Sequence, residues 1–441
     1  MSEAPICSVR GLEKHYPITS GLLRREVGRV RAVDGVSFDI ERGEALGIVG
    51  ESGSGKTTTA HTVLGLEEPT AGQVCFDGEP VAELTGSERR SFRRRAQLVV
   101  QDPNDALDPR MTVGEAVAEP LRIHGLDDAD RRRAVVADVL ERVGLSRDDV
   151  ERYPHEFSGG EKQRISIARA LVVSPDLIVA DEPTSALDAR VRAEILDLLD
   201  RIRREFDVAL LFVSHDLDVV RRSCDRVAVM YLGEIVERGA TGDVLADPAH
   251  PYTRVLLSSV PSLDPTDREL GRPLTDTVPD PSDPPAGCRF HPRCPDVIPP
   301  DDLSVSTETW RAIARFRFSL RAGELPEEAV GAETGAARDG ERRTATQVRR
   351  AVGLEEELAD PDAEQAVGDA AASLAAGDAA AAAETLAAAF TSVCERETPA
   401  AVDRPDGEER DGAATGAVSC LRHGRDGGAE PVESTGVDER R

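Results

Sequence analysis

Lysine is nearly absent from this sequence of 441 residues: only Lys14, Lys56 and Lys162 occur, and the remaining strongly basic residues are arginine. The formal net charge is −28. We expect no nucleic-acid partner, because phosphates would be repelled. An acidic chain with so little lysine is typical of proteins adapted to concentrated salt, where screening weakens repulsion between carboxylates. The composition predicts a protein from a halophile, although a GC-rich genome and an acidic tail would give a similar bias.

Three further absences limit where the chain works. No run of about 18 apolar residues is present, so we expect no membrane-spanning helix. The first residues lack the basic-then-apolar pattern of a secretory signal. The cysteines are scattered and odd in number, which disfavours a disulfide framework and indicates a reducing cytosol; they are Cys7, Cys75, Cys224, Cys288, Cys294, Cys394 and Cys420.

Residues 1–255 read as one α/β domain. Short apolar runs alternate there with longer amphipathic segments, as strands alternate with crossover helices. We expect strands at 44–50, 97–101, 176–181 and 208–216, and their almost continuous apolar character predicts a buried sheet. Between the second and third of these strands the sequence turns polar and helix-favouring, which predicts an inserted helical subdomain over about 102–165.

The remaining chain is poorer in apolar residues. Residues 256–330 are rich in proline and aspartate, which predicts an irregular extension with one short helix at 308–323. Residues 331–441 contain mainly alanine, glycine, arginine and acidic residues. Because this segment cannot bury enough apolar area to offset the entropy lost on ordering, we predict a largely disordered acidic tail with transient helix around 370–390.

A glycine-rich loop, GESGSGKTT at 50–58, follows a predicted strand and opens a helix. It fits the pattern G-x-x-x-x-G-K-[ST] of a phosphate-binding loop. Glycines let backbone N–H groups approach phosphate oxygens, and the helix N-terminus adds its dipole. Lys56 would reach the β- and γ-phosphates and Thr57 would bind Mg²⁺. The predicted ATP-binding residues of this loop are Gly50, Ser52, Gly53, Ser54, Gly55, Lys56, Thr57 and Thr58.

Polar residues end three other apolar strands. Asp181 and Glu182 close the strand LIVADE, where a P-loop enzyme needs a carboxylate near Mg²⁺ and a general base for the attacking water. His215 follows LLFVS and could hold the water and the base in line. Gln101 follows LVV and could sense Mg²⁺ and the γ-phosphate. The predicted catalytic residues are Glu182, His215 and Gln101, and the predicted Mg²⁺ ligands are Thr57, Gln101 and Asp181.

A second possible anion site lies at FSGGEKQR, residues 157–164, where Ser-Gly-Gly opens a helix. Taken in order, GESGSGKTT, VVQDP, FSGGEKQR, LIVADEPTSALD and VSHD resemble the ATP-binding cassette of ABC proteins over residues 8–255. The resemblance implies a P-loop NTPase (RecA-like) α/β core with an inserted helical subdomain and an antiparallel β subdomain. It also implies ATP hydrolysis with ATP and Mg²⁺ as cofactors.

In that family two cassettes pair head to tail, and the signature loop of one covers the γ-phosphate held by the P-loop of the other. The resemblance implies that the signature loop here is SGGE at 158–161. One residue departs from the family: Glu161 stands where glutamine is common, and an ionised carboxylate cannot donate a hydrogen bond. The further ATP-binding residues implied by the resemblance are Tyr16, which would stack on adenine, with Ser158, Gly159, Gly160, Glu161 and Asp188.

Finer segments resemble the ATPases of dipeptide and oligopeptide importers. These are RAVDGVSFDIERGEALGIVGESGSGKTT, and HPYTRVLLSSVP just beyond the cassette. The segment GCRFHPRCP at 287–295 also resembles the extension of that subfamily, which in some members holds an iron–sulfur cluster. Only Cys288 and Cys294 remain at that segment. Because two thiolates do not supply the usual four ligands, we expect no cluster there.

The resemblance also implies partners and a location. They are a second ABC ATPase (a paralogue or a second copy), two membrane permease subunits and an external substrate-binding protein, with this chain peripheral on the cytoplasmic face of the cell membrane. Two alternatives are kept: an ABC ATPase for another solute such as nickel or a sugar, and a soluble ABC ATPase of DNA repair or translation. The intact Lys56, Asp181, Glu182 and His215 argue against a regulatory protein with a decayed site. The 56 residues between Gln101 and Ser158 leave no room for the long coiled coil of repair types.

Overall fold

The computed structural model describes residues 4–21, 24–258, 273–330, 344–404, 409–410, 413–414 and 416–424. The described chain forms two compact units. The first contains residues 4–248 and the turn Asp280–Pro284, and the second contains 249–258, 273–279 and the residues from Pro285 onward. The predicted boundary at 255 therefore lies a few residues beyond the end of the first unit's main segment.

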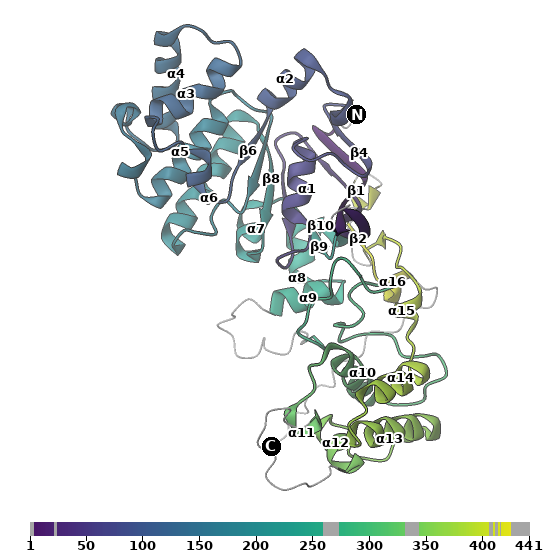
Figure 1. The fold of residues 1–441 in the computed structure, drawn as a ribbon. Helices are drawn as coiled ribbons and strands as arrows, with labels where there is room; N and C mark the ends of the chain where they lie inside the picture. Colours follow the sequence, from purple (N-terminus) through teal and green to yellow (C-terminus); the bar gives the residue numbers. More distant parts are fainter. Residues whose placement is uncertain are drawn as a thin grey trace, which may run out of the picture. The chain divides into compact units, whose positions relative to one another are not determined.

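A mostly parallel sheet forms the centre of the first unit (Figure 1). Its strand order is β10-β9-β3-β8-β7-β6, and only β10 runs antiparallel to its neighbour. The residues of β3, β7 and β8 are all buried, as their continuous apolar sequences predict. The bounds are β3 Ala45–Val49, β6 Ala96–Val99, β7 Leu177–Asp181, β8 Ala209–Ser214, β9 Arg226–Tyr231 and β10 Glu234–Ala240.

An antiparallel sheet of order β2-β1-β4-β5 completes the core of this unit. Helix α1 (Lys56–Val63) packs against strands of both sheets. Phe38 and Ile40 of the antiparallel sheet share one apolar cluster with Leu46 and Ile48 of the parallel sheet. The bounds are β1 Cys7–Ser20, β2 Arg25–Ile40, β4 Ala71–Phe76 and β5 Glu79–Pro80, with η1 Val81–Glu83, α2 Gly86–Arg95, α6 Ala189–Phe206, α7 Leu217–Ser223 and α8 Thr241–Ala246.

The predicted helical subdomain follows β6. Three of its segments begin with a capping box in which Ser or Thr pairs with an acidic residue three positions later: Thr112, Ser146 and Ser158. Its last helix continues to Leu171, beyond the predicted end near 165, because its second half packs on the sheet at β6. The bounds are η2 Pro103–Ala106, α3 Val113–Ile123, α4 Ala129–Arg142, η3 Arg147–Glu151, η4 Pro154–Glu156 and α5 Gly159–Leu171.

The second unit is helical with irregular connections. Residues 273–306 contain no helix or strand, as their proline content predicts, and the helix expected at 308–323 is α10 (Thr307–Ala322). The other bounds are α9 Pro251–Ser258, α11 Glu327–Val330, α12 Ala345–Ala351, α13 Pro361–Ala375, α14 Ala379–Ala389, α15 Val393–Arg396 and α16 Leu421–Gly424, with the two-residue strands β11 Val402–Asp403, β12 Glu409–Arg410, β13 Ala413–Ala414 and β14 Ala417–Val418.

The prediction of a disordered tail is wrong for residues 344–404. Alanines at helical spacing let α13 and α14 pack closely, and Ala370, Ala382 and Leu386 are fully buried. Additional apolar contact area for the tail is supplied by a helix outside it. Phe390 lies against Trp310 of α10, with ring centroids 6.5 Å apart. The sequence argument weighed the tail alone and so omitted this partner. Residues 331–343 lie outside the described part of the chain.

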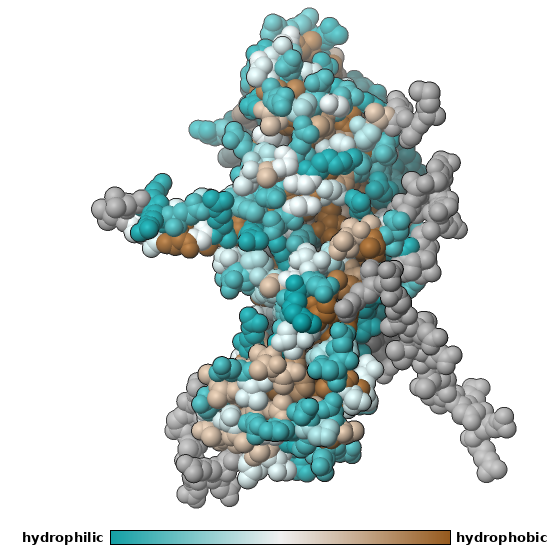
Figure 2. Space-filling view, turned by 90° about the vertical axis from the view of Figure 1, so that its right-hand side faces the viewer, coloured by the Kyte–Doolittle hydropathy of each residue, from teal (hydrophilic) through white to brown (hydrophobic). Residues whose placement is uncertain are grey.

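The described helices and the visible surface have two further features. In the described residues no helix has the length and apolarity needed to span a bilayer. On the face shown in Figure 2, hydrophilic side chains predominate and apolar side chains lie among them. This surface agrees with the formal net charge of −28.

Candidate nucleotide site

The loop between β3 and α1 has the backbone form of a phosphate cradle. Gly55 caps α1 with φ +104°, a conformation that L side chains rarely adopt. A Cβ at Gly50 would lie 2.1 Å from the Met230 carbonyl oxygen, and one at Gly55 would lie 2.0 Å from that of Ala32. Both glycines are therefore required by close packing as well as by phosphate chemistry.

Lys56 points back into this loop. Its Nζ donates to the carbonyl oxygens of Gly50 and Glu51, each at 2.8 Å, and the residue is only 5% exposed. Burial lowers the pKa of Lys56, while the nearby carboxylates of Glu182 and Asp181 oppose that shift. A buried ammonium held by carbonyl oxygens is ready to exchange these partners for phosphate oxygens.

Thr57 and Asp181 meet where a Mg²⁺ ion could be held. The Thr57 hydroxyl donates to Asp181 Oδ1 at 3.2 Å, joining the start of α1 to the end of β7. Asp181 is 6% exposed, and burial raises the pKa of its carboxyl group. A hydroxyl and a carboxylate are oxygen ligands of the kind Mg²⁺ prefers. A cation here would also offset the cost of burying the charged form of Asp181.

Glu182 is held by two predicted partners. Gln101 Nε2 donates to Glu182 Oε2 at 3.0 Å, and His215 Nδ1 lies 2.9 Å from Glu182 Oε1. The Glu182 backbone has φ +44°, in the left-handed region that non-glycine residues seldom occupy. Its N–H donates to the Val213 carbonyl of β8 at 2.9 Å, which helps to hold that backbone. Three strand ends thus orient one carboxylate, the arrangement a general base requires.

These residues line one cavity of about 540 Å³. Ser52, Gly53, Gly55, Lys56, Thr57, Thr58, Gln101, Glu182 and His215 were predicted, and Val30, Ala32 and Pro281 were not. Of the other predicted site residues, Gly50 and Asp181 contact lining residues, Ser54 lies near Lys56, and Tyr16, Ser158–Glu161 and Asp188 do not line the cavity.

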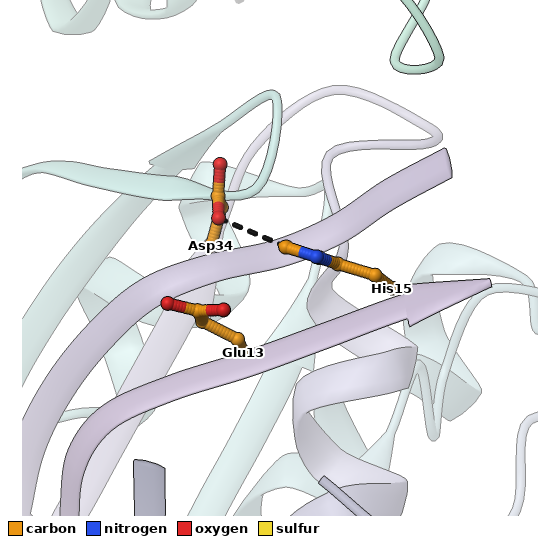
Figure 3. Close-up of side chains that lie close together, drawn as sticks. All are labelled: Glu13, His15 and Asp34. Atoms are coloured by element: carbon orange, nitrogen blue, oxygen red, sulfur yellow. Dashed lines mark hydrogen bonds and ion pairs between the residues drawn. The ribbon is translucent and has the colours of Figure 1, made fainter. Parts of the chain in front are cut away.

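Tyr16 lies on the cavity side of the β1–β2 hairpin without lining the cavity. It pairs directly with Val30 across the two strands, and such partners project from the same face of a sheet. Beside it, His15 Nε2 and Asp34 Oδ1 lie 2.9 Å apart, with Glu13 close by (Figure 3). Since the Asp34 carboxylate also pairs with Arg31, we interpret the cluster as a tie between the strands.

The segment Ser158–Glu161 closes on itself in the single chain. Ser158 caps α5, its hydroxyl and N–H donate to Glu161 Oε2 at 2.7 and 2.8 Å, and the Glu161 N–H returns to the serine oxygen at 3.4 Å. These hydrogen bonds lower the pKa of the Glu161 carboxyl group. Asp188 likewise caps α6. Both segments are preformed helix starts.

Comparisons with known proteins identify the family. Residues 33–185 match the ABC transporter family, and residues 236–299 match the oligopeptide/dipeptide transporter C-terminal region. A peptide import ATP-binding protein of Brucella ovis is 51% identical over 298 residues, which cover 68% of this chain and 92% of the relative. The chain belongs to the ABC transporter ATPases. ATP hydrolysis is the activity of this family.

Further relatives carry similar descriptions. The oligopeptide transport ATP-binding protein AppF of Bacillus subtilis is 46% identical over 305 residues, covering 68% of this chain and 92% of its own. Among solved structures, cbiO1 of Clostridium perfringens is 29% identical with a TM-score of 0.49, covering 58% of this chain and 96% of its own. Residues 307–407 match a domain of unknown function, DUF8228, so this ABC ATPase carries an additional module.

Four cysteines gather in the second unit, two more than the sequence argument counted. The Cys288 N–H donates to the Cys394 carbonyl at 2.8 Å. Burial raises the pKa of the Cys294 thiol, and the thiols of the other three raise it further. Burial also raises the pKa of Cys420 to about 11. Helices α10–α14 lie between Cys294 and Cys394 in the sequence, but the folded chain brings the two cysteines near each other.

The four thiols match the ligand number of an iron–sulfur cluster. A single tetrahedral zinc ion with Zn–S bonds of about 2.3 Å would hold its sulfurs roughly 3.8 Å apart. Among the described residues, no three of these cysteine sulfurs lie within 4.8 Å of one another. The sulfurs are therefore not at the spacing of a tetrahedral zinc site, and four thiols instead of two remove the reason for expecting no cluster.

Sequence reasoning missed two kinds of residue. Cys394 and Cys420 carried a usable signal, because four cysteines, an even number, remain once Cys7, Cys75 and Cys224 of the other unit are set aside. Val30, Ala32 and Pro281 carried none, since apolar residues in a hairpin and a proline-rich loop have no pattern that marks a pocket wall.

Proposed function

We propose that this chain is the ATPase subunit of an importer of dipeptides or oligopeptides. The match of residues 236–299 to the oligopeptide/dipeptide transporter C-terminal region supports the peptide cargo, together with the peptide-import descriptions of relatives such as the Brucella ovis protein. Two permease subunits in the membrane and an external binding protein would complete the importer. The chain would act peripherally at the cytoplasmic face of the cell membrane.

One observation carries the proposed mechanism: the ATP cavity is lined by the P-loop, Gln101, Glu182 and His215, but not by Ser158–Glu161. We infer that a second cassette supplies this segment, and that ATP held between two cassettes closes them on each other. In the composite site Lys56 would hold the β- and γ-phosphates, Thr57 and Asp181 would hold Mg²⁺ with Gln101, and Glu182 would accept a proton from the attacking water. Closure of the two cassettes would change the conformation of the permeases, and ATP hydrolysis would let the cassettes separate again.

Lys56→Arg tests the nucleotide site. We expect the affinity for Mg·ATP to fall roughly ten- to hundredfold, which corresponds to the loss of hydrogen bonds to a charged group. The planar guanidinium of arginine does not fit a loop shaped around the smaller ammonium of lysine. Lys162→Arg is the matched control, since the half-buried Lys162 donates from its side chain to Asn104 at 3.0 Å and does not line the cavity. Equal ATP affinity in the Lys56→Arg variant and the parent, measured by calorimetry, would contradict the assignment.

Glu161→Gln tests the signature segment. We expect the ATP concentration for half-maximal hydrolysis to fall about two- to fivefold, because the change removes a negative charge beside the triphosphate and weakens the hold on the Ser158 hydroxyl. Glu115→Gln is the control, since Glu115 forms the same capping box with Thr112 on α3. An unchanged or higher ATP requirement in Glu161→Gln would argue against a partner's triphosphate at this place.

We propose further that Cys288, Cys294, Cys394 and Cys420 hold an iron–sulfur cluster. Protein purified without oxygen should contain iron and acid-labile sulfide and absorb visible light, and Cys394→Ser and Cys420→Ser should each lose most of both. Cys75→Ser, in β4 of the first unit, should lose neither. Equimolar zinc without sulfide, or four freely titratable thiols in the parent protein, would overturn this proposal without affecting the ATPase assignment.

The cargo is tested with the complete importer in vesicles. Peptide-loaded binding protein should stimulate ATP hydrolysis several-fold, whereas the same assembly offered a nickel complex or a sugar should stay at its basal rate. If only nickel or a sugar stimulates hydrolysis, that solute is the cargo and the peptide assignment is wrong, whereas the proposed ATPase mechanism is unaffected.

A further inference from the structure

A turn from the C-terminal extension forms part of the ATP cavity. Residues Asp280–Pro284 belong to the first unit, although they lie more than thirty residues beyond its main segment. The backbone N–H of Arg31 in β2 donates to the Pro281 carbonyl at 3.1 Å, and Pro281 itself lines the cavity. The turn therefore docks on the free edge of β2, since β1 is the neighbour of β2 in the antiparallel sheet.

The turn is built to hold its shape. The Asp280 carboxylate accepts from the N–H and the hydroxyl of Ser282, at 2.8 and 2.7 Å, and the Asp283 N–H donates to the Asp280 carbonyl at 3.0 Å. Aspartate first and proline second are the residues favoured in a type I turn, because the proline ring presets the required φ. Pro281 therefore meets the cavity on a preorganised loop.

The residues beside Pro281 indicate which part of the nucleotide it would meet. In the proposed site, Lys56, Thr57 and the strand-end residues would hold the phosphates and Mg²⁺. Val30 and Ala32, on the β2 segment that bonds to the turn, are apolar and offer the phosphates no side-chain partner. An apolar wall suits the nucleoside, whose base and ribose carry the uncharged surface of ATP.

We propose that Pro281 contacts the nucleoside of bound ATP, so that the extension, and not the cassette alone, determines nucleotide affinity. The inference rests on the proposed ATP site and extends it. The cassette match ends at residue 185, whereas Pro281 lies in the segment that matches the oligopeptide/dipeptide transporter C-terminal region. Nucleotide binding in this chain then depends on the correct seating of a turn that leads directly into the second unit at Pro285.

The test separates nucleoside from phosphate. In the full-length protein, Pro281→Ala should weaken Mg·ATP binding about five- to tenfold, the effect of removing ring CH₂ groups from a contact. Binding of inorganic tripolyphosphate should change less than about twofold, because it lacks the nucleoside. Pro284→Ala is the matched control: it belongs to the same segment but does not line the cavity, so both affinities should be retained.

Two results would overturn the inference. Unchanged ATP affinity in Pro281→Ala would show that the ring makes no contact with the nucleoside. An equal loss for ATP and tripolyphosphate would show that the turn only supports the P-loop. Failure of the parent protein to bind either ligand would instead contradict the nucleotide site itself, and Lys56→Arg reports on that site separately.

Discussion

Glu182→Gln should slow ATP hydrolysis by at least about two orders of magnitude, the size of a general-base effect. The amide keeps the shape of the side chain and its contact with His215 at the same position, but it cannot accept a proton from water. ATP binding should be retained, because Lys56 and the P-loop are unchanged. Phosphate release under conditions of saturating Mg·ATP measures the rate.

The same variant should accumulate as an ATP-bound pair of cassettes, since closure no longer ends in hydrolysis. Size-exclusion chromatography with Mg·ATP should show a dimer that is absent without nucleotide. Glu205→Gln, on the exposed last turn of α6, makes the same chemical change away from the site and should hydrolyse ATP like the parent. A Glu182→Gln protein that stays monomeric and hydrolyses normally would refute the catalytic assignment.

Glu395→Ala should lower the free energy of unfolding of the second unit by about 3–5 kcal/mol, the usual cost of removing one member of a buried ion pair. Arg317 Nη1 and Nη2 donate to the two Glu395 carboxylate oxygens at 2.5 and 2.7 Å, and the Arg317 side chain is 8% exposed. Removing Glu395 leaves the guanidinium buried with the Phe390 carbonyl as a remaining partner. Chemical denaturation followed by the Trp310 signal of α10 measures the loss.

The pH dependence provides a second readout. Burial would raise the pKa of Glu395, but the hydrogen bonds and charge of Arg317 outweigh it, so the pKa lies below its usual value. The pair therefore stabilises the unit fully above the unfolded pKa of about 4.3, and this stability is lost as the pH falls through the lower folded pKa. Glu395→Ala should remove this acid-dependent contribution.

Arg350→Ala is the control for this prediction. Arg350 is 77% exposed in its side chain and pairs with Glu355 at 3.4 Å, so its removal should cost no more than about 1 kcal/mol. If Glu395→Ala unfolds at the same denaturant concentration as the parent, the buried pair and the ordered fold of residues 344–404 are both wrong. A disordered tail, as the composition predicted, would give that outcome.

The strands and the phosphate loop could be predicted because their signals are local. The apolar run 177–180 before Asp181 is typical of a buried strand, and it forms most of β7. Glycines and Lys56 in fixed order define a cradle within nine residues. The polar residues that end these strands also follow, because parallel strands place their carboxyl ends at one edge of a sheet, as Gln101 and Glu182 show.

The tail was misjudged because burial depends on partners far away in sequence. The composition correctly indicates that residues 331–441 have little apolar area of their own. The composition of the tail cannot reveal its contacts with α10, where Trp310 packs on Phe390 and Arg317 pairs with Glu395. Alanine, which adds little apolar surface by itself, becomes a close-packing residue once a second helix is present.

The sequence by itself therefore determined the α/β core, the phosphate loop and the position of Glu182 at a strand end, since each depends on neighbours within a few residues or on strands of one sheet. Only the tertiary structure brought Cys394 and Cys420 to the other two cysteines and placed Pro281 against β2. Those contacts join segments about one hundred residues or more apart, and nothing in either segment alone specifies its partner. These contacts form only when the chain folds, because each one requires both of its segments to be held in place by the residues packed around them.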